Sequence, residues 1–321
     1  MRYFLLVLAF VTSIFTLLIA PGGLLRNVEN NEDIVIVIEK GVSSKDIAFL
    51  LKQKKVIPHP YGALAGIALL KVMRKTLKHG EYLLSPHDTL WDSLKKIADG
   101  AVIKHLITIA EGLTVHEVVQ KLNAISILNG EITDLPKEGF LLPQTYDYYY
   151  GDSRQELIKR MVNAMDNIKS QLWNHHQYNA YLESWDEVLT LASIVEKETA
   201  LAEERPIVAS VYLNRLEKGM PLQADPTVIY AVTNGETSFV RPISKADLII
   251  DSAYNTYVNA DLPPTPIACP GEASIKAVLN PSNTNYLYFV ADGNGGHNFN
   301  TTLKDHNASV SRWKALKKQR A

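Results

Sequence analysis

The 321-residue sequence predicts an α+β protein made of an N-terminal transmembrane helix, a small β-α module and a mixed helix-and-strand domain. Three observations predict this fold class. An apolar run opens the chain, short β-branched runs then alternate with helical patterns, and longer amphipathic stretches follow, separated by proline- and glycine-rich loops. We place the anchor at residues 1–25, the module at 30–110, a linking region at 111–186 and the last domain at 187–321.

The composition excludes several classes of protein. Apolar residues make up 46% of the chain and charged residues 21%, which is typical of a folded protein. The 33 basic and 34 acidic residues leave a formal net charge of -1, so no broad positive field favours nucleic acid. Because Cys269 is the only cysteine, no internal disulfide can form, which suits a bacterial envelope protein that relies on its core.

The first element is an apolar run from Tyr3 to Ala20, interrupted by three hydroxyl residues and close to the minimum length of a membrane-spanning helix. Arg2 precedes the run and Pro21-Gly22-Gly23 ends it. Both a cleaved secretory signal and an uncleaved anchor fit this pattern. The run is longer than a usual signal core and lacks a clean cleavage site, so we favour an anchor in the cytoplasmic (inner) membrane, with the remaining chain on its outer, periplasmic side.

The module is predicted from a repeated strand, turn and helix rhythm. A β-branched run predicts the first strand, and Ser43 or Ser44 can cap the helix that follows it. We expect strands at residues 34–39, 80–84 and 103–109. We expect helices at residues 44–52, 61–75, 90–97 and 115–122, with Gly100 ending the third.

The linking region contains an unusually tyrosine-rich loop, residues 144–150, preceded by two prolines. Tyrosine rings can stack on sugar faces, but a packing loop between domains fits the composition equally well. A long amphipathic helix from Arg154 to about His175 follows this loop.

The helix at residues 187–199 is the element around which the last domain is organised. Its apolar stripe leads, one turn further on, to Glu198, while Glu196 should point to the opposite, wet side. The stripe consists of Val188, Leu191, Ala192 and Val195. Burial disfavours a charged carboxylate and raises its pKa, so Glu198 could hold a proton near neutral pH and act as a general acid. The same pattern also fits a glutamate that bends out to solvent or pairs with a lysine.

Polar residues follow this helix in a loop that enters a later one. A second helix, residues 207–216, ends at Lys218-Gly219, and the loop after it carries Gln223, Asp225 and Thr227. Asp225 fits an N-cap with Pro226 in the first turn, and the same loop could line a groove beside Glu198.

The last third of the chain adds further polar groups. Asn255 and Tyr257 precede a proline-fixed loop at residues 262–271, and a strand at 286–291 leads into a hairpin that presents His297 and Asn298. The glycines of this hairpin lack the Lys-Ser/Thr of a nucleotide loop. His297 and His306 have no third ligand at a recognisable spacing, so we expect neither a metal nor another cofactor.

Five motifs together resemble one known family. They are Ala192–Thr199, Val211–Leu216, Leu222–Thr227, Tyr254–Tyr257 and Gly295–Phe299. They look like the motifs of the YceG-like endolytic murein (peptidoglycan) transglycosylases. The resemblance is specific over about residues 187–307 and looser over 30–186.

This resemblance implies a LysM-like module at residues 30–110 and a catalytic domain at 187–321. It also implies a lyase that cleaves the β-1,4 bond between N-acetylmuramic acid (MurNAc) and N-acetylglucosamine (GlcNAc), leaves a 1,6-anhydroMurNAc end, and terminates or trims nascent glycan strands. The implied catalytic residue is Glu198, and the implied partners are glycan strands, cell-wall synthesis enzymes and the membrane. We expect substrate contacts from Gln223, Asp225, Thr227, Asn255, Tyr257, His297 and Asn298.

Two alternatives remain at this point. A hydrolase normally needs two carboxylates, so a muramidase with Asp225 as the second acid is one alternative. A lytic enzyme needs only one carboxyl, because the 6-hydroxyl of the sugar attacks in place of water. The other alternative is a non-catalytic envelope scaffold that binds peptidoglycan through its first domain.

Overall fold

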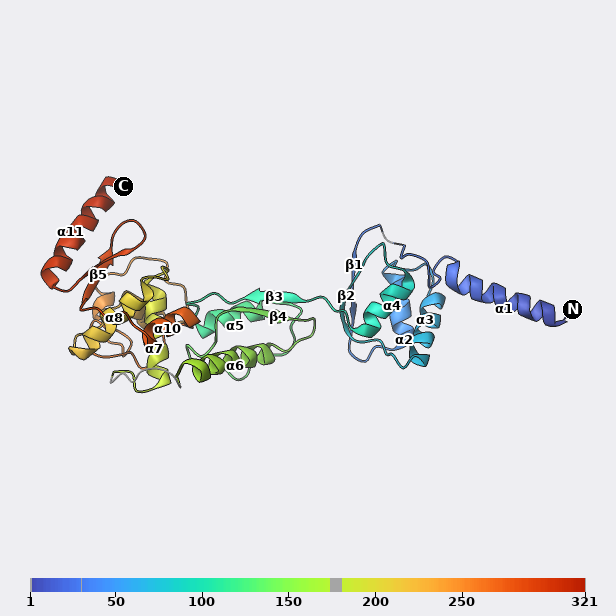
Figure 1. The fold of residues 1–321 in the computed structure, drawn as a ribbon, viewed down its shortest axis with the longest axis horizontal. Helices are drawn as coiled ribbons and strands as arrows, with labels where there is room; N and C mark the ends of the chain where they lie inside the picture. Colours follow the sequence, from blue (N-terminus) through green and yellow to red (C-terminus); the bar gives the residue numbers. More distant parts are fainter. Residues whose placement is uncertain (1, 30, 174–180, 321) are drawn as a thin grey trace. The chain divides into compact units, whose positions relative to one another are not determined.

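The computed structural model describes residues 2–29, 31–173 and 181–320 (Figure 1). The chain divides into two compact units. Unit 1 contains Met1–Leu106 and Asp147–Asp152, and unit 2 contains Ile107–Tyr146 and Ser153–Ala321. Helices and short strand pairs occur in both units, so the predicted α+β class is confirmed.

Unit 1 is a strand pair packed with three helices. Strands β1 (Ile34–Ile38) and β2 (Gly80–Leu84) are antiparallel, with Ile36 opposite Tyr82. Its helices after the N-terminal one are α2 (Ser44–Gln53), α3 (Tyr61–Val72) and α4 (Leu90–Asp99). Both central strand residues, Ile36 and Tyr82, are fully buried, so the strand pair forms part of the core of this unit.

Local sequence signals fix the ends of these helices. Ser43 caps α2 through a bond from the Asp46 amide, as predicted. Thr89 and Asp92 form a reciprocal capping box at the start of α4. Gly100 ends α4 with a φ of 77°, a left-handed conformation that a glycine adopts without steric cost.

The N-terminal helix α1 covers Arg2–Ile19, where the sequence predicts the anchor. Over the part of the chain that the structure describes, no helix combines the length and apolarity that a membrane crossing requires. The fold therefore supports a helix at this place but gives no support to a membrane span.

The tyrosine-rich segment forms a strand that the sequence does not predict. Strand β4 (Thr145–Tyr148) pairs with β3 (His105–Thr108). Tyr146 is buried and its hydroxyl donates to the Leu142 carbonyl at 2.7 Å, while Tyr148 is also buried and stacks on His105. These two rings therefore pack within the fold instead of facing a sugar.

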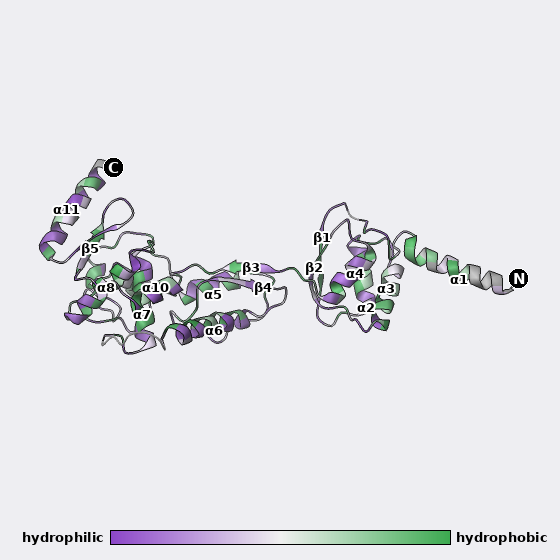
Figure 2. Cartoon of the chain, in the orientation of Figure 1, coloured by the Kyte–Doolittle hydropathy of each residue, from purple (hydrophilic) through white to green (hydrophobic). Residues whose placement is uncertain are grey.

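Unit 2 is mainly helical. Its N-terminal part contains α5 (Val115–Asn123) and α6 (Arg154–Leu172). Apolar and polar residues alternate along α6 (Figure 2). The last part of the predicted long helix, to about residue 175, falls partly outside the described residues. The remaining helices are α7 (Trp185–Glu198), α8 (Arg205–Glu217), α9 (Asp225–Thr233), the 3₁₀ turn η2 (Asp247–Ile249), α10 (Glu272–Leu279) and α11 (Leu303–Arg320).

Helix α7 is the centre of unit 2. Ser184 and Glu187 form a capping box at its start, and every residue from Val188 to Val195 is buried. It packs against α8, α9 and α10. The sequence predicts one apolar stripe here, but neighbours surround the helix, so the buried surface extends around its whole circumference.

A hairpin and the last helix complete unit 2. Strands β5 (Tyr288–Ala291) and β6 (His297–Asn300) are antiparallel and form the predicted hairpin, on which α11 packs. Helix α10 follows the proline-fixed loop and is not predicted by the sequence.

Candidate active site

A polar pocket of about 230 Å³ opens at the end of α7. Six segments of unit 2 supply its walls: the end of α7, the helix α8, the loop into α9 with the first residue of that helix, the loop after η2, strand β5 and helix α11. Its lining residues are Glu198, Tyr212, Arg215, Leu222, Gln223, Asp225, Tyr257, Phe289 and His306.

Glu198 is the last residue of α7 and is only partly exposed. Burial raises the pKa of its carboxyl from 4.5 to about 7; the bond from Tyr212 opposes this rise, and the charge of Asp225 adds to it. Half of such carboxyls carry a proton at neutral pH. Glu198 can therefore donate a proton and afterwards accept one, which is what general acid and base catalysis requires.

Tyr212 holds the Glu198 carboxyl in place. Its hydroxyl donates to Glu198 Oε1 at 2.8 Å, and its ring is buried and meets Phe289 edge to face at 5.9 Å. Burial is the largest cause of a Tyr212 pKa well above 10, so this hydroxyl stays protonated and remains a donor. The neutral hydroxyl fixes the orientation of the carboxyl without a full countercharge.

Arg215 brings a fixed positive charge to the pocket. Its Nε donates to the Leu287 carbonyl at 2.7 Å and its Nη1 to the Leu222 carbonyl at 2.7 Å, and its guanidinium lies 5.3 Å from the Tyr288 ring centre. Burial lowers the pKa of Arg215, but an arginine stays charged in proteins. These carbonyl bonds hold the guanidinium rigidly beside the two pocket carboxyls.

Asp225 is the second carboxylate of the pocket. The hydroxyl of Tyr257 donates to its Oδ1 at 2.6 Å. The prediction that Asp225 is an N-cap is wrong, because Ala224 occupies that position and Asp225 is the first residue of α9. Its side chain is thus free to take the Tyr257 bond and face the pocket beside Gln223, whose φ of 48° turns the chain there.

His306 enters the pocket from α11. Its ring stacks on Tyr288 at 5.3 Å, and its buried Nδ1 has no hydrogen-bond partner among the described residues. Burial and the nearby Arg215 charge lower the pKa of His306, so the ring is neutral. A neutral imidazole carries one N–H, and an N–H group buried without a partner costs more free energy than an unpaired nitrogen lone pair. We therefore assign the ring hydrogen of His306 to Nε2.

Four predicted substrate-binding residues do not line this pocket. Thr227 is fully buried and bonds the Ala224 carbonyl and the Thr256 hydroxyl. Asn255 is also buried, donates to the carbonyls of Leu248 and Ile250, and accepts from the Tyr257 amide at 3.0 Å. Both therefore shape the loops that carry Asp225 and Tyr257.

The other two, His297 and Asn298, lie on β6. His297 Nδ1 contacts Glu204 Oε2 at 2.6 Å, and the same oxygen accepts a bond from the Thr199 hydroxyl at 3.1 Å. This network ties the hairpin to the residue that follows Glu198. Asn298 is exposed and is not part of the pocket wall.

Glu196 does not face solvent, contrary to the prediction from helical geometry. Its side chain is only 5% exposed, lies 3.3 Å from Arg205 Nη2, and accepts from the Gly271 amide at 2.9 Å. Helix α10, which the sequence does not reveal, and the proline-fixed loop before it cover the side of α7 expected to be wet.

The pocket also contains residues that the sequence motifs do not assign to substrate binding: Tyr212, Arg215, Leu222, Phe289 and His306. A signal for two of them exists: Tyr212 and Arg215 are three residues apart, on one face of α8. A tyrosine and an arginine on a buried helix face need polar partners, which indicates a polar site. Phe289 and His306 come from distant segments and carry no such local signal.

Comparison with known proteins identifies the family of the chain. The YceG-like family model matches residues 36–312. The chain is 32% identical in sequence to a yceG-like protein from Listeria monocytogenes of known crystal structure. The two structures superpose with a TM-score of 0.52 over 87% of this chain and 99% of that one.

Two curated relatives share part of the sequence. The endolytic murein transglycosylase of Bacillus subtilis (strain 168) is 40% identical over 186 residues, which are 58% of this chain and 50% of that protein. The endolytic murein transglycosylase of Streptococcus pneumoniae serotype 2 is 35% identical over 180 residues, 54% of this chain and 32% of that protein. The chain thus spans half or less of the length of these relatives.

Proposed function

The chain belongs to the YceG-like family, and on that premise we propose that it is an endolytic peptidoglycan lytic transglycosylase. The observation that carries the proposal is Glu198, a carboxyl with a pKa of about 7 at the wall of a polar pocket. The names of the curated relatives support the same reaction.

In the first step, Glu198 donates its proton to the glycosidic oxygen between MurNAc and GlcNAc. The bond from C1 of MurNAc to that oxygen breaks, and GlcNAc leaves with a new hydroxyl. The Tyr212 hydroxyl, which donates to Glu198 Oε1, leaves Oε2 to carry the proton toward the substrate. Asp225, held by Tyr257, stabilises the positive charge that develops at C1.

In the second step, the Glu198 carboxylate accepts the proton of the 6-hydroxyl of the same MurNAc. The 6-oxygen bonds to C1 and closes the 1,6-anhydro ring, so no water is consumed. A pKa near 7 suits both steps, because the acid and its conjugate base are of similar stability at neutral pH.

Mass analysis of the products tests this reaction. Purified glycan strands incubated with the protein should give ends lighter by one water than hydrolytic ends. Ends that carry the added water would overturn the lytic reaction. An unchanged mass distribution would instead point to a binding scaffold.

A two-carboxylate muramidase is the second candidate, because Asp225 lines the same pocket as Glu198. The variant Asp225→Asn separates the two reactions. In the lytic reaction it slows cleavage but keeps the anhydro ends, whereas in the hydrolase it removes the group that activates water or attacks C1.

We further propose the cellular setting from the sequence. The apolar run Tyr3 to Ala20 would anchor the chain in the cytoplasmic membrane, with the pocket on the outer side where peptidoglycan lies. The LysM-like module would bind glycan, and cell-wall synthesis enzymes would be its protein partners. Retention of the full chain in membranes after alkaline extraction is expected, and its release would contradict the anchor.

A further inference from the structure

Helix α3 of unit 1 carries an exposed apolar face. Tyr61 is 71% exposed, Leu69 45% and Val72 80%, and all three project from one side of the helix, with Met73 directly after it at 54%. The opposite side packs into the core through Ile67 and Leu70. Lys71 is the only charged residue of α3, so the helix is apolar on nearly its whole circumference. Such a helix requires a second apolar surface.

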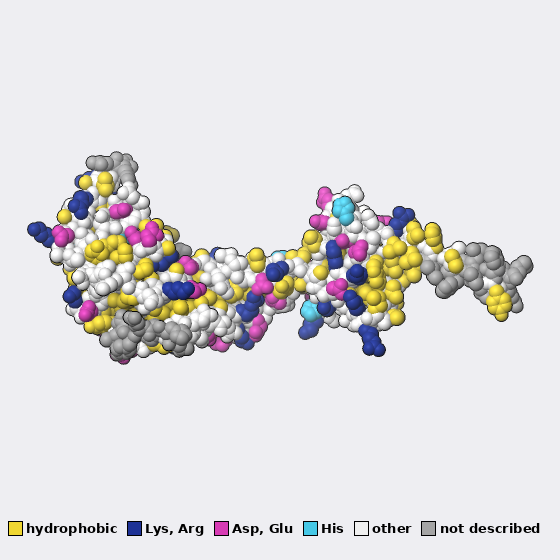
Figure 3. Space-filling model, in the orientation of Figure 1, with side chains coloured by type: hydrophobic (Ala, Val, Ile, Leu, Met, Phe, Trp, Pro, Cys, Tyr) yellow, Lys and Arg dark blue, Asp and Glu magenta, His cyan; other side chains and the backbone are white. Residues whose placement is uncertain are grey.

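Basic residues lie beside the C-terminal end of this face. Between Asp46 and Glu81 the sequence has no acidic residue, and Figure 3 shows Lys and Arg side chains at the edge of a hydrophobic surface in unit 1. The basic residues of this stretch are Lys52, Lys54, Lys55, Lys71, Arg74, Lys75 and Lys78. Lys75 pairs with Asp99, but Lys71 and Arg74 are exposed beside Val72 and Met73. The surface is therefore apolar along α3, with a positive rim at the C-terminal end of the helix.

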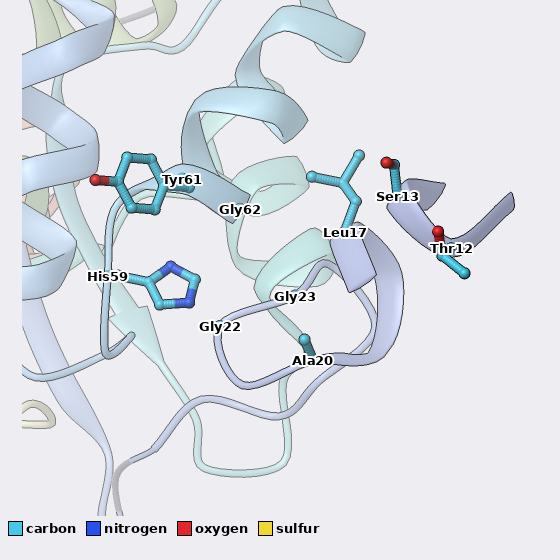
Figure 4. A pocket seen from close by; sticks show the side chains of 9 residues that line it. All are labelled: Thr12, Ser13, Leu17, Ala20, Gly22, Gly23, His59, Tyr61 and Gly62. Carbon is cyan, nitrogen blue, oxygen red and sulfur yellow. The ribbon is translucent and has the colours of Figure 1, made fainter. Parts of the chain in front are cut away.

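The end of α1 is fixed to the start of α3. The Gly22 carbonyl lies so close to Gly62 that a Cβ there would be 1.9 Å from its oxygen. Figure 4 shows Gly22 and Gly23 next to His59 and Gly62.

Backbone bonds also join the segment after α1 to α4, from the Trp91 amide to the Leu24 carbonyl and from the Leu90 amide to the Arg26 carbonyl, both at 2.9 Å. The apolar face of α3 therefore has a fixed position next to the point where α1 leaves the module.

We propose that this face of α3 lies on the surface of an anionic phospholipid bilayer. Apolar side chains in the centre match the acyl boundary, and a basic rim matches anionic headgroups, which is the arrangement of helices that lie in a membrane interface. The adjacent apolar N-terminal run is the second feature that points to lipid. The proposal concerns the module alone and does not depend on glycan cleavage by unit 2.

A fluorescent label tests this contact in the full chain. The environment-sensitive label is attached at Val72→Cys in a Cys269→Ala background, with Val35→Cys as the matched control. Val35 is also an exposed valine of unit 1, at 45%, but it lies on β1. In vesicles containing equal phosphatidylglycerol and phosphatidylcholine, the label at position 72 should shift to the blue and be quenched by spin-labelled lipid, and the label at 35 should not.

Charge reversal tests the basic rim. Lys71→Glu with Arg74→Glu should weaken the quenching of the label at position 72, because each basic residue near an anionic surface changes partitioning by about fivefold. The same reversal at Lys40 and Lys95, two exposed lysines of other segments of unit 1, should have little effect. Equal quenching in phosphatidylcholine alone would overturn the assignment to anionic lipid.

Other outcomes would also overturn the proposal. A label at position 72 that is shifted to the blue but not quenched by spin-labelled lipid would mean that protein, such as a second copy, covers α3. If the chain floats with the vesicles but the label at position 72 is not quenched, α1 anchors the chain and α3 stays in water. A chain that does not float would contradict both the anchor and this surface, while cleavage of dissolved glycan strands would still report on the proposed enzyme.

Discussion

The two sides of the last turn of α7 give two glutamates different surroundings. On one side, Glu198 faces a pocket, is partly exposed and accepts a hydrogen bond from the neutral Tyr212 hydroxyl. On the other side, Glu196 is almost fully buried beside the Arg205 guanidinium and the Gly271 amide. The same side chain, two residues apart, is therefore held near its protonation midpoint at one position and ion-paired at the other.

The partner of a buried carboxyl therefore decides its role. A guanidinium stabilises the ionised form, whereas a hydroxyl compensates only part of the desolvation cost. Glu198 accordingly keeps a pKa of about 7. Catalytic and structural acids on one helix can thus be told apart by the groups that face them.

The largest expected effect is the loss of activity in Glu198→Gln. The amide keeps the size of the side chain but cannot donate a carboxyl proton, so cleavage of glycan strands should fall by about 10²- to 10⁴-fold. Product formation followed by chromatography measures the loss. An unchanged rate with an unchanged fold would assign the acid to another residue.

The matched substitution on the other side, Glu196→Gln, should act on stability. Removing one partner of a buried ion pair leaves Arg205, whose side chain is 11% exposed, without its nearest charge. Arg205 keeps a second partner, because Glu111 Oε2 lies 3.6 Å from its Nη2. A loss of about 1 to 3 kcal/mol in the free energy of unfolding is therefore expected, less than the cost of a fully unpaired buried charge. Chemical denaturation measures it, and the folded variant should keep most of its activity. A large loss of rate with wild-type stability would exchange the roles of the two glutamates.

The raised pKa of Glu198 also predicts how stability depends on pH. Because the folded state holds this proton more tightly than the unfolded state, its contribution is complete below about pH 4.5 and is lost as pH rises through about 7. The loss amounts to about 3 kcal/mol. Comparing denaturation at acidic and alkaline pH in the wild type and in Glu198→Gln isolates this contribution, which the variant should lack. Parallel curves for the two proteins would mean that Glu198 has an ordinary pKa.

A smaller effect is expected for Tyr212→Phe. Its hydroxyl bond lowers the pKa of Glu198, so its removal should raise that pKa further and move the alkaline limb of the rate profile to higher pH. The maximal rate should fall by about 10-fold or less, the equivalent of one hydrogen bond. A limb that stays in place, or moves to lower pH, would contradict this role for Tyr212.

The smallest effect is expected at His306. Gln places a donor near the position of Nε2, whereas Asn places one near Nδ1. If the Nε2 hydrogen contacts the sugar, His306→Gln should keep the KM and His306→Asn should raise it several-fold, about the value of one neutral hydrogen bond. Equal KM values in the two variants would argue against this contact.

Much of the fold was predictable because its signals are local. Ser43, Gly100 and the β-branched run of β1 fix helix and strand ends through caps, turns and propensity, and the structure has them where expected. The strand β4 and the helix α10 were not predictable. Each is short and is stabilised by contacts with residues far away in the sequence. The local pattern of apolar and polar residues carries no information about such contacts.

The site was predictable to the extent that one helix and one loop define it. Glu198, Gln223, Asp225 and Tyr257 lie together in the pocket, as the sequence motifs suggested. The surroundings of Glu196 were not predictable, because the loop before α10 covers that side of α7 from about 75 residues away. Helical periodicity predicts the direction in which a side chain points, but tertiary packing decides which groups it contacts.

Direct titration of Glu198 tests this account most sharply. The protein would be labelled with ¹³C at the glutamate carboxyl carbons, and the Glu198 resonance would be identified by its absence in Glu198→Gln. We predict that this carboxyl titrates near pH 7. A Glu198 midpoint near the ordinary value of 4.5 would contradict the claim that its surroundings keep a proton available for catalysis.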